Sequence, residues 1–286
     1  MGHVSRSGAV AGALAELDHR PRCVGLGAPA PFERDGIAWE AADAPPPWEV
    51  VLLLDSYRLE ADSVGGAGVT LAVIHDGDSI PAAASLAISV NEPAGRPPAG
   101  VRVAAGPEFA ALRPQFRAVP EPSISAGVKR VLVTTGSSDR AASVAAIAAA
   151  VRDRVSAHLT AVIGPYSDAR DVTADRLVTA PESLLDELTA CDLVVCAAGQ
   201  TMLEALACGT PCVAIPFVDN QRRQAEMLAS RGAVVTADSV DEAASAAQRL
   251  AGDAEERRRL SRTARETIDG RGAERAAAAV AELIPG

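Results

Sequence analysis

The sequence of 286 residues predicts an α/β protein with two domains. Its second half alternates apolar, strand-like runs with helix-like segments, which argues for a parallel sheet covered by helices on both faces. In the first half, three apolar runs end in polar residues, as an open α/β sheet requires, because ligands bind beyond the carboxyl ends of its strands. Residues 116–129 contain two prolines, a glycine and no periodicity, which is typical of a linker. We therefore expect domains at 1–119 and 120–286, each large enough for its own core.

The first domain should contain a helix over residues 4–17, where apolar residues recur on one face. Strands are expected at 50–54, 69–74 and 86–90. The polar residues that follow them begin with Asp55, His75 and Asn91. His75, Asp76 and Asp78 form either a metal cluster or an ordinary polar loop that closes a strand.

The second domain should contain strands at 130–135, 159–163, 177–179, 192–197, 212–215 and 233–236. Helices are expected from about residue 140 to 155, over 181–190, 200–208 and 221–231, and in three segments after Val240. Pro181 suits the first position of its helix. The segment after Ala197 is the most informative, because Gly199 allows a sharp turn and Gly209 ends the following helix. The N-terminus of that helix favours an anion.

Composition excludes several classes of function. A net charge of −10 and an aromatic content of 3% argue against nucleic-acid binding. No apolar run approaches the roughly 20 residues of a membrane span, and no secretory signal is visible, so we expect a cytoplasmic protein without stable membrane insertion. The five cysteines lack zinc spacing and are expected to be buried thiols, without disulfides.

A spaced set of residues resembles the donor-site segment of two-domain, GT-B-type proteins that bind UDP-sugars. The set comprises Gly199, Thr201, Glu204, Ala205, Gly209, Pro211, Pro216, Asn220 and Gln221. The pattern looks most like the UDP-2,4-diacetamido-2,4,6-trideoxy-β-L-altropyranose hydrolases of pseudaminic acid synthesis and related spore-coat polysaccharide proteins. The UDP-N-acetylglucosamine transferase of peptidoglycan synthesis is a looser match.

The resemblance extends to the first half of the chain. Residues 1–6 are similar to the Gly-x-Gly-His-x-x-Arg loop of these hydrolases, Asp55-Ser56-Tyr57 to their Asp-x-Tyr, and residues 136–139 to a phosphate-side turn. Gly106, residues 111–113 and Phe116 are similar to the exit segment of their first domain. Gln200 stands where the family commonly has a small hydroxyl residue. His75-Asp76 stands where the family often has two acidic residues. The family also has a strand and a glycine loop before the histidine. Either this chain begins late or in a fragment, or its first domain lacks that strand.

The resemblance implies two Rossmann-like domains in a GT-B-type arrangement, with a UDP-sugar between them and no cofactor or metal. It implies hydrolysis to UDP and free sugar, with His3 as the general base, a role that suits imidazole at neutral pH. The alternatives are a UDP-sugar-dependent glycosyltransferase and a catalytically disabled nucleotide-sugar binding protein. On sequence chemistry alone, a frayed terminal residue is the favoured interpretation of a histidine at position 3, and the Val-Ser-Arg that follows and the downstream matches reverse that preference.

The remaining site residues carry their own alternatives. Tyr57 either contacts the sugar or water, or is a half-buried residue at a strand end. Glu204 either accepts from ribose hydroxyls or is a solvated helix carboxylate, and Asn220 with Gln221 either contacts the sugar or caps a helix. Asp139 is expected to cap a helix. The residues expected to contact substrate through side chain or backbone are Gly2, Arg6, Gly136, Ser137, Gly199, Gln200, Thr201, Glu204, Asn220 and Gln221.

Overall fold

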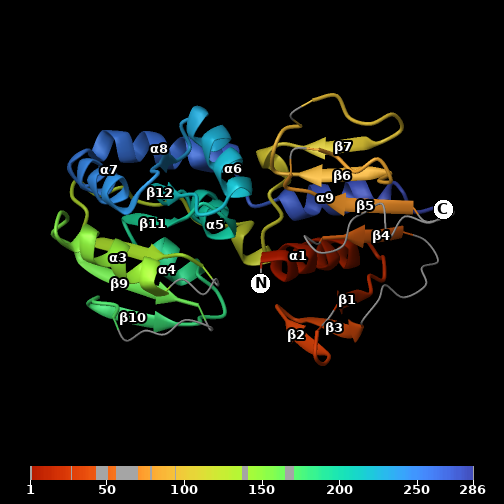
Figure 1. Cartoon of the computed structure of the whole chain (residues 1–286), viewed down its shortest axis with the longest axis horizontal. Coiled ribbons are helices and arrows are strands. Elements are labelled where there is room, and N and C mark those ends of the chain that lie inside the picture. Colours follow the sequence, from red (N-terminus) through yellow and green to blue (C-terminus); the bar gives the residue numbers. More distant parts are fainter. Residues whose placement is uncertain are drawn as a thin grey trace. The chain divides into compact units, whose positions relative to one another are not determined.

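The structure is a computed structural model, and it describes residues 2–26, 28–42, 51–55, 70–77, 79–93, 95–136, 141–164 and 171–285. The chain divides into two compact units (Figure 1). Unit 1 comprises Met1–Arg117 together with Gly270–Gly286, and unit 2 comprises Ala118–Asp269. This division differs from the predicted ranges 1–119 and 120–286 mainly in the last segment, because the final helix packs with the first unit.

Unit 2 is built on a six-stranded sheet in which every described pair of neighbouring strands is parallel. The strands are β8 (Arg130–Thr134), β9 (His158–Ile163), β10 (Arg176–Thr179), β11 (Leu193–Ala197), β12 (Cys212–Ile215) and β13 (Val235–Thr236). They lie in the order β10-β9-β8-β11-β12-β13. The chain therefore builds outward from β8 to β10 and then returns to place β11 beside β8. This reversal is the topological switch point at which open α/β sheets bind ligands.

Helices cover the sheet of unit 2 on both faces, which explains why β11 and β12 are buried along their whole length. The helices are α3 (Ala141–Arg152), α4 (Leu185–Ala190), α5 (Gln200–Cys208), α6 (Asp219–Ser230), α7 (Val240–Gly252) and α8 (Ala254–Thr267). Ser239 and Asp253 cap α7 and α8 by accepting from backbone N–H groups. α4 begins at Leu185 rather than at Pro181, and α6 begins two residues before the predicted start.

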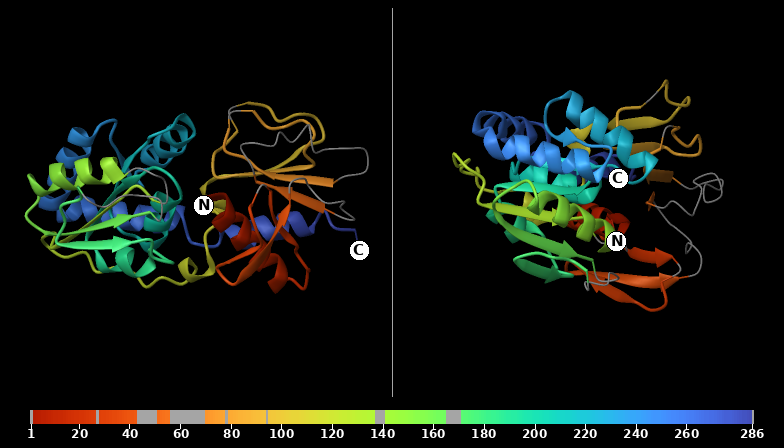
Figure 2. Two further views of the ribbon diagram at one scale, coloured as in Figure 1. Left: turned by 60° about the horizontal axis from the view of Figure 1, so that its bottom comes forward. Right: turned by 60° about the vertical axis from the view of Figure 1, so that its left-hand side comes forward.

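Unit 1 contains a parallel sheet in the order β4-β5-β6-β7, formed by β4 (Val51–Leu54), β5 (Thr70–Ile74), β6 (Leu86–Ser89) and β7 (Arg102–Ala105). One face packs against α1 (Gly2–Glu16) and α9 (Gly272–Ala281), which bury Val10, Leu14, Ala276 and Val280 against Leu86, Ile88 and neighbouring residues (Figure 2). The helix predicted at 4–17 is confirmed as α1, and the segments after Val240 are confirmed as α7, α8 and α9.

A second, smaller sheet in unit 1 was not predicted. It consists of β1 (Cys23–Leu26), β2 (Phe32–Arg34) and β3 (Ile37–Ala42) in the order β1-β3-β2. β2 and β3 form an antiparallel hairpin through Asp35 and Gly36, whose φ angles of 53° and 76° suit a type I′ turn. The Asp-Gly dipeptide between Arg34 and Ile37 was the available signal. β1 and β4 are both edge strands, and among the described residues no strand joins the two sheets.

No helix within the described part of the chain has the length and apolar character that crossing a bilayer requires.

Candidate functional site

The switch point of unit 2 brings together two segments that the sequence singled out. β8 and β11 are paired along their length, so the residues that follow them emerge side by side. Gly136 has a left-handed φ of 77°, and a Cβ at this position would lie 3.3 Å from the Oγ1 of Thr201. The N–H of Gly136 donates to the Oγ1 of Thr134 at 3.1 Å. Gly136 and Thr201 are therefore neighbours, and the backbone at Gly136 needs the freedom of glycine.

The helix α5 begins directly at this edge. Gly199 is its N-cap residue and offers no side chain to the first turn, and Gly209 ends the helix with a left-handed φ of 70°. The N–H groups and positive dipole end of α5 therefore point toward the loop after β8, an arrangement that favours an anion. Gln200 and Thr201 form the first turn of this helix.

Gln221 reaches the same junction from α6. Its Oε1 accepts from the N–H of Phe217 at 3.0 Å, and its Nε2 lies 3.2 Å from the place that a Cβ on Gly199 would occupy. The amide is thus held by its carbonyl end and presents its N–H groups toward Gly199. Asn220 lies in the first turn of α6, and the N-cap position belongs to Val218. The helix-cap alternative for Asn220 is therefore wrong.

Glu204 is buried in α5, with only 5% of its surface exposed, so the alternative of a solvated carboxylate is also wrong. Burial and the nearby carboxylate of Glu204 raise the pKa of Cys208 to about 12. A buried carboxylate requires polar neighbours, because desolvation of a charge is costly. The role of Glu204 at a ribose stays a prediction.

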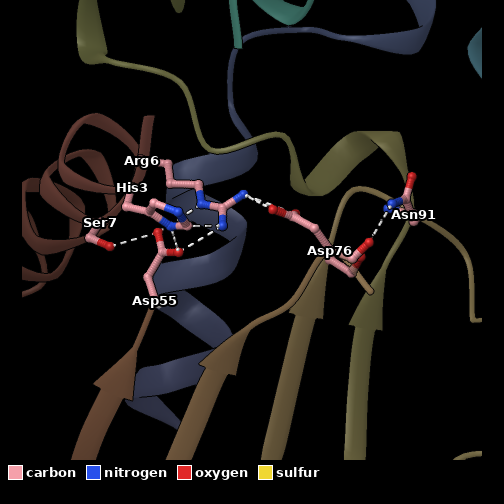
Figure 3. Close-up of polar contacts among 7 residues, drawn as sticks. His3, Arg6, Ser7, Asp55, Asp76 and Asn91 are labelled. Atoms are coloured by element: carbon pink, nitrogen blue, oxygen red, sulfur yellow. Dashed lines mark hydrogen bonds and ion pairs between the residues drawn. The ribbon is translucent and has the colours of Figure 1, made fainter. Parts of the chain in front are cut away.

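Unit 1 carries a second polar cluster where α1 begins and where β4, β5 and β6 end (Figure 3). His3, Arg6 and Ser7 come from the first two turns of α1, and Asp55, Asp76 and Asn91 follow the three strands. Helix and sheet are held in this register because Val10, Ala13 and Leu14 pack on the same sheet.

Asp55 is the centre of the unit 1 cluster. The Nδ1 of His3 and the NH2 of Arg6 both contact its Oδ1, the latter at 2.7 Å. Its Oδ2 accepts from the Nε of Arg6 at 2.7 Å and from the hydroxyl of Ser7 at 2.9 Å. Burial opposes ionisation of this carboxyl, but the bonds from Arg6 and His3 hold the pKa of Asp55 below its usual value.

The guanidinium of Arg6 also binds a second carboxylate. Its NH1 donates to the two carboxylate oxygens of Asp76 at 2.9 and 2.7 Å. Although burial favours the neutral form, the two carboxylates raise the pKa of Arg6 above its already high value. Arg6 was predicted to contact substrate, but its charge is engaged by Asp55 and Asp76.

The arrangement around His3 defines what the ring can do. A carboxylate on Nδ1 favours the tautomer with a proton on that nitrogen and the lone pair on Nε2. The same carboxylate stabilises the imidazolium once Nε2 has accepted a proton. The cluster is therefore suited to general-base chemistry.

Several predicted residues cannot be placed, because Tyr57, Ser137, Asp78 and Asp139 lie outside the described residues. Gly2 is the first residue of α1. Asp76 binds Arg6, and no group of three or more metal-ligating side chains occurs in the described part of the chain. Asp55 and Asp76 were not predicted to contact substrate, although both follow strands at the edge where ligands bind.

The five cysteines are free thiols, as expected. Cys196, Cys208 and Cys212 are buried, and the Sγ atoms of Cys196 and Cys212 are 3.6 Å apart on neighbouring strands. Cys23 and Cys191 are partly buried.

Residues 178–267, which include α5 and α6, match the family model of glycosyl transferases group 1. One curated relative is the UDP-N-acetylglucosamine–N-acetylmuramyl-(pentapeptide) pyrophosphoryl-undecaprenol N-acetylglucosamine transferase of Geobacter sulfurreducens. It is 48% identical over 66 residues, which cover 21% of this chain and 18% of the relative. Another is the spore coat polysaccharide biosynthesis protein SpsG of Bacillus subtilis, 26% identical over 146 residues, or 47% of this chain and 43% of the relative. The matched segments thus span less than half the length of these relatives.

The solved structure of the glycosyltransferase SnogD from Streptomyces nogalater is similar over 99% of this chain and 97% of its own length. The TM-score is 0.58 and the sequence identity is 20%, so the likeness concerns the fold. The chain has a GT-B-type fold with two Rossmann-like units, as the sequence predicted.

Proposed function

We propose that this protein binds a UDP-sugar and transfers its glycosyl group, with the nucleotide held by unit 2. The observation that carries the proposal is the meeting of Gly136, Gly199, Thr201 and Gln221 at the switch point. Gly199, Thr201 and Gln221 lie at or near the N-terminus of α5 and within residues 178–267, the segment that matches glycosyl transferases group 1. Gly136 lies outside that segment and is brought beside Thr201 by the pairing of β8 with β11. A helix N-terminus beside backbone that approaches closely suits a diphosphate.

Individual residues of unit 2 have distinct roles in this proposal. The N–H groups at Gly199–Thr201 and at Gly136 bind the diphosphate. Ser137, the next residue in the chain, keeps its predicted role as a substrate contact. Gln221 donates from its Nε2, and Asn220 contacts the sugar or the diphosphate. Glu204 accepts from the ribose hydroxyls, since a carboxylate can bind two vicinal hydroxyls at once. These contacts stabilise the negative charge that develops on the departing UDP.

In unit 1, His3 acts as the general base. Its Nε2 removes the proton from an acceptor hydroxyl while the acceptor oxygen bonds to the anomeric carbon. The bond between that carbon and the β-phosphate oxygen breaks, and UDP leaves with the electron pair. Asp55 holds the ring and stabilises the imidazolium. Tyr57, which follows the same strand, would contact the sugar or the acceptor.

Hydrolysis is the second candidate, because water can replace the acceptor hydroxyl without changing the base. The observation that favours it is the grouping of His3, Arg6 and Asp55, the residues of the first half that resemble the loop and Asp-x-Tyr motif of the UDP-sugar hydrolases. In that case the products are UDP and the free 2,4-diacetamido-2,4,6-trideoxyhexose.

The test is incubation of the purified protein with UDP-N-acetylglucosamine and with a UDP-2,4-diacetamido-2,4,6-trideoxyhexose, each with and without a panel of sugar and lipid acceptors. UDP release that depends on an acceptor supports transfer, whereas equal amounts of UDP and free sugar without one support hydrolysis. Tight UDP binding without turnover would identify a binding protein. Absence of UDP binding by calorimetry would contradict all three functions.

A further inference from the structure

The far side of the Arg6 guanidinium is bound as firmly as the side that faces Asp55. The Nε and NH2 atoms form a two-pronged contact with Asp55, and NH1 contacts the two oxygens of Asp76 (Figure 3). The planar group is therefore fixed from two directions, and its donors on both sides have acceptors. Its side chain is only 14% exposed, so rotation away from either partner would leave buried donors unsatisfied.

Asp76 is itself held in place. It follows β5, and the Nδ2 of Asn91, which follows β6, donates to its backbone carbonyl at 3.3 Å. Asn91 is only 3% exposed, and its own N–H donates to the Oγ of Ser89 at 3.0 Å. A chain of contacts thus runs from Asn91 through Asp76, Arg6 and Asp55 to His3, the most exposed member among the side chains of the ion pairs.

We propose that Asp76 is a positioning residue that acts through Arg6 and Asp55 on the orientation of His3. The inference rests on the role of His3 in the function proposed above. Asp76 contacts Arg6, whose NH2 in turn contacts Asp55 and lies 3.3 Å from the Nδ1 of His3, so Asp76 acts by fixing Arg6. With Arg6 fixed, both oxygens of the Asp55 carboxylate keep their contacts, and Oδ1 stays against the Nδ1 of His3.

The charges of the cluster also bear on the transfer of a proton to His3. The charged groups around His3 include Arg6 on its own helix, Asp55 after β4 and, beyond Arg6, Asp76 after β5. With His3 neutral, one cation and two carboxylates leave one negative charge, and protonation of His3 neutralises the cluster. Without the charge of Asp76, the cluster is neutral before His3 takes a proton and positive afterwards, which disfavours the protonated ring.

The decisive variant is Asp76→Asn, compared with Asp35→Asn as a matched control. Asp35 also pairs with an arginine of unit 1, Arg113 at 3.2 Å, and asparagine suits its place in the hairpin turn. For Asp76→Asn we expect kcat to fall about tenfold to a hundredfold, less than the loss on removing a strong general base, with UDP affinity unchanged. In a plot of kcat against pH, the fall in kcat on the acid side (the acid limb) should move to lower pH. The control should keep the wild-type kcat and profile.

Asp76→Glu separates position from charge, because it keeps the carboxylate on a longer side chain. We expect its kcat to fall while its acid limb stays where the wild-type limb lies. This variant also carries the test if Asp76→Asn does not fold. Wild-type kcat and an unmoved acid limb in a folded Asp76→Asn, or wild-type kcat in Asp76→Glu, would overturn the proposal.

A measurement without turnover distinguishes failure of this inference from failure of the proposed function. The chain contains four histidines, so the ring signals can be followed by NMR and that of His3 assigned with His3→Ala. In Asp76→Asn the ring signals of His3 should move when both proteins are compared at one pH, because the contact between Asp55 and the Nδ1 of His3 changes once Arg6 has lost a partner. Unchanged ring signals contradict the inference, whether or not the wild type turns over any UDP-sugar.

Discussion

The ring of His3 is the residue on which the proposed reaction depends. We expect His3→Ala to lower kcat by at least about a hundredfold, because the group that removes the acceptor proton is lost. UDP affinity should stay within error, since the proposed diphosphate contacts belong to unit 2. Steady-state kinetics and calorimetry with UDP check the two parts separately, and His19→Ala serves as the control because His19 follows the other end of α1. Unchanged turnover would remove His3 from the mechanism.

The carboxylate of Asp55 makes the free energy of unfolding of unit 1 depend on pH in the acidic range. Its pKa is lowered in the folded state, so its contacts stabilise the fold above the pKa near 3.9 of an unfolded aspartate. That contribution is lost as the pH falls from about 4 through the lower folded pKa. The wild type should therefore lose more free energy of unfolding than Asp55→Asn between pH 6 and pH 3. Urea unfolding followed by tryptophan fluorescence reports unit 1 through Trp39, which is buried there, and residues 118–269 contain no tryptophan. Parallel stability curves for the two proteins would refute this assignment.

Among the elements, the junction of β8 and α5 gives the clearest test of the nucleotide site. Gly136→Ala places a Cβ in a left-handed conformation and 3.3 Å from the Oγ1 of Thr201. We expect a loss of about 1–2 kcal/mol in stability and weaker UDP binding, because the backbone N–H groups shift. Gly127→Ala is the matched control, since a Cβ there has no atom within 4 Å and the φ is not positive. Equal UDP affinity in the two variants would argue against a diphosphate at this junction.

The helices and strands of unit 2 could be predicted closely, because the apolar runs, their lengths and the glycines at turns and helix ends all indicate the same boundaries. The run from Leu193 to Ala197 is apolar and β-branched, and Gly199 and Gly209 mark the turn and the helix end that follow. The strand from Cys212 to Ile215 was predicted at its observed bounds. The strands of the small sheet in unit 1 were not predicted, because β1 and β2 are short and have no strict alternation. β7 was missed because its four residues begin with a charged arginine.

For the polar cluster of unit 1 and the junction of unit 2, the sequence did not predict which residues become neighbours. The sequence gives no direct sign that Asp76 binds Arg6, because the two residues are 70 positions apart and meet only when β5 lies beside β4. Polar residues at strand ends could be recognised individually, but their partners depend on the order of the strands. Gly199 and Gln221 were predicted as site residues from one motif, and their proximity follows from the packing of α6 beside the junction.

For the whole molecule, the return of the chain to unit 1 depends on Gly270. Its φ is 77°, and a Cβ there would lie 2.1 Å from the carbonyl oxygen of Phe116. The atoms that this Cβ would meet belong to the backbone of Phe116 and Arg117, so they cannot move cheaply. Gly270→Ala should destabilise unit 1 by about 2–4 kcal/mol. Thermal unfolding followed by tryptophan fluorescence measures this, with Gly252→Ala as the control, because a Cβ there meets open space near the end of α7. Equal melting temperatures would contradict the close approach.

The membership of α9 in unit 1 also has a consequence for synthesis on the ribosome. Unit 2 is continuous in sequence, so all of it has left the ribosome once Asp269 has emerged. Unit 1 lacks Ala273, Ala276, Ala277 and Val280 of its core until residues 270–286 have also emerged. Although domains often fold in the order in which they are made, here unit 1 must wait until all of unit 2 has been made. Its apolar sheet face, with Leu86 and Ile88, is then the surface that a chaperone would meet on the nascent chain.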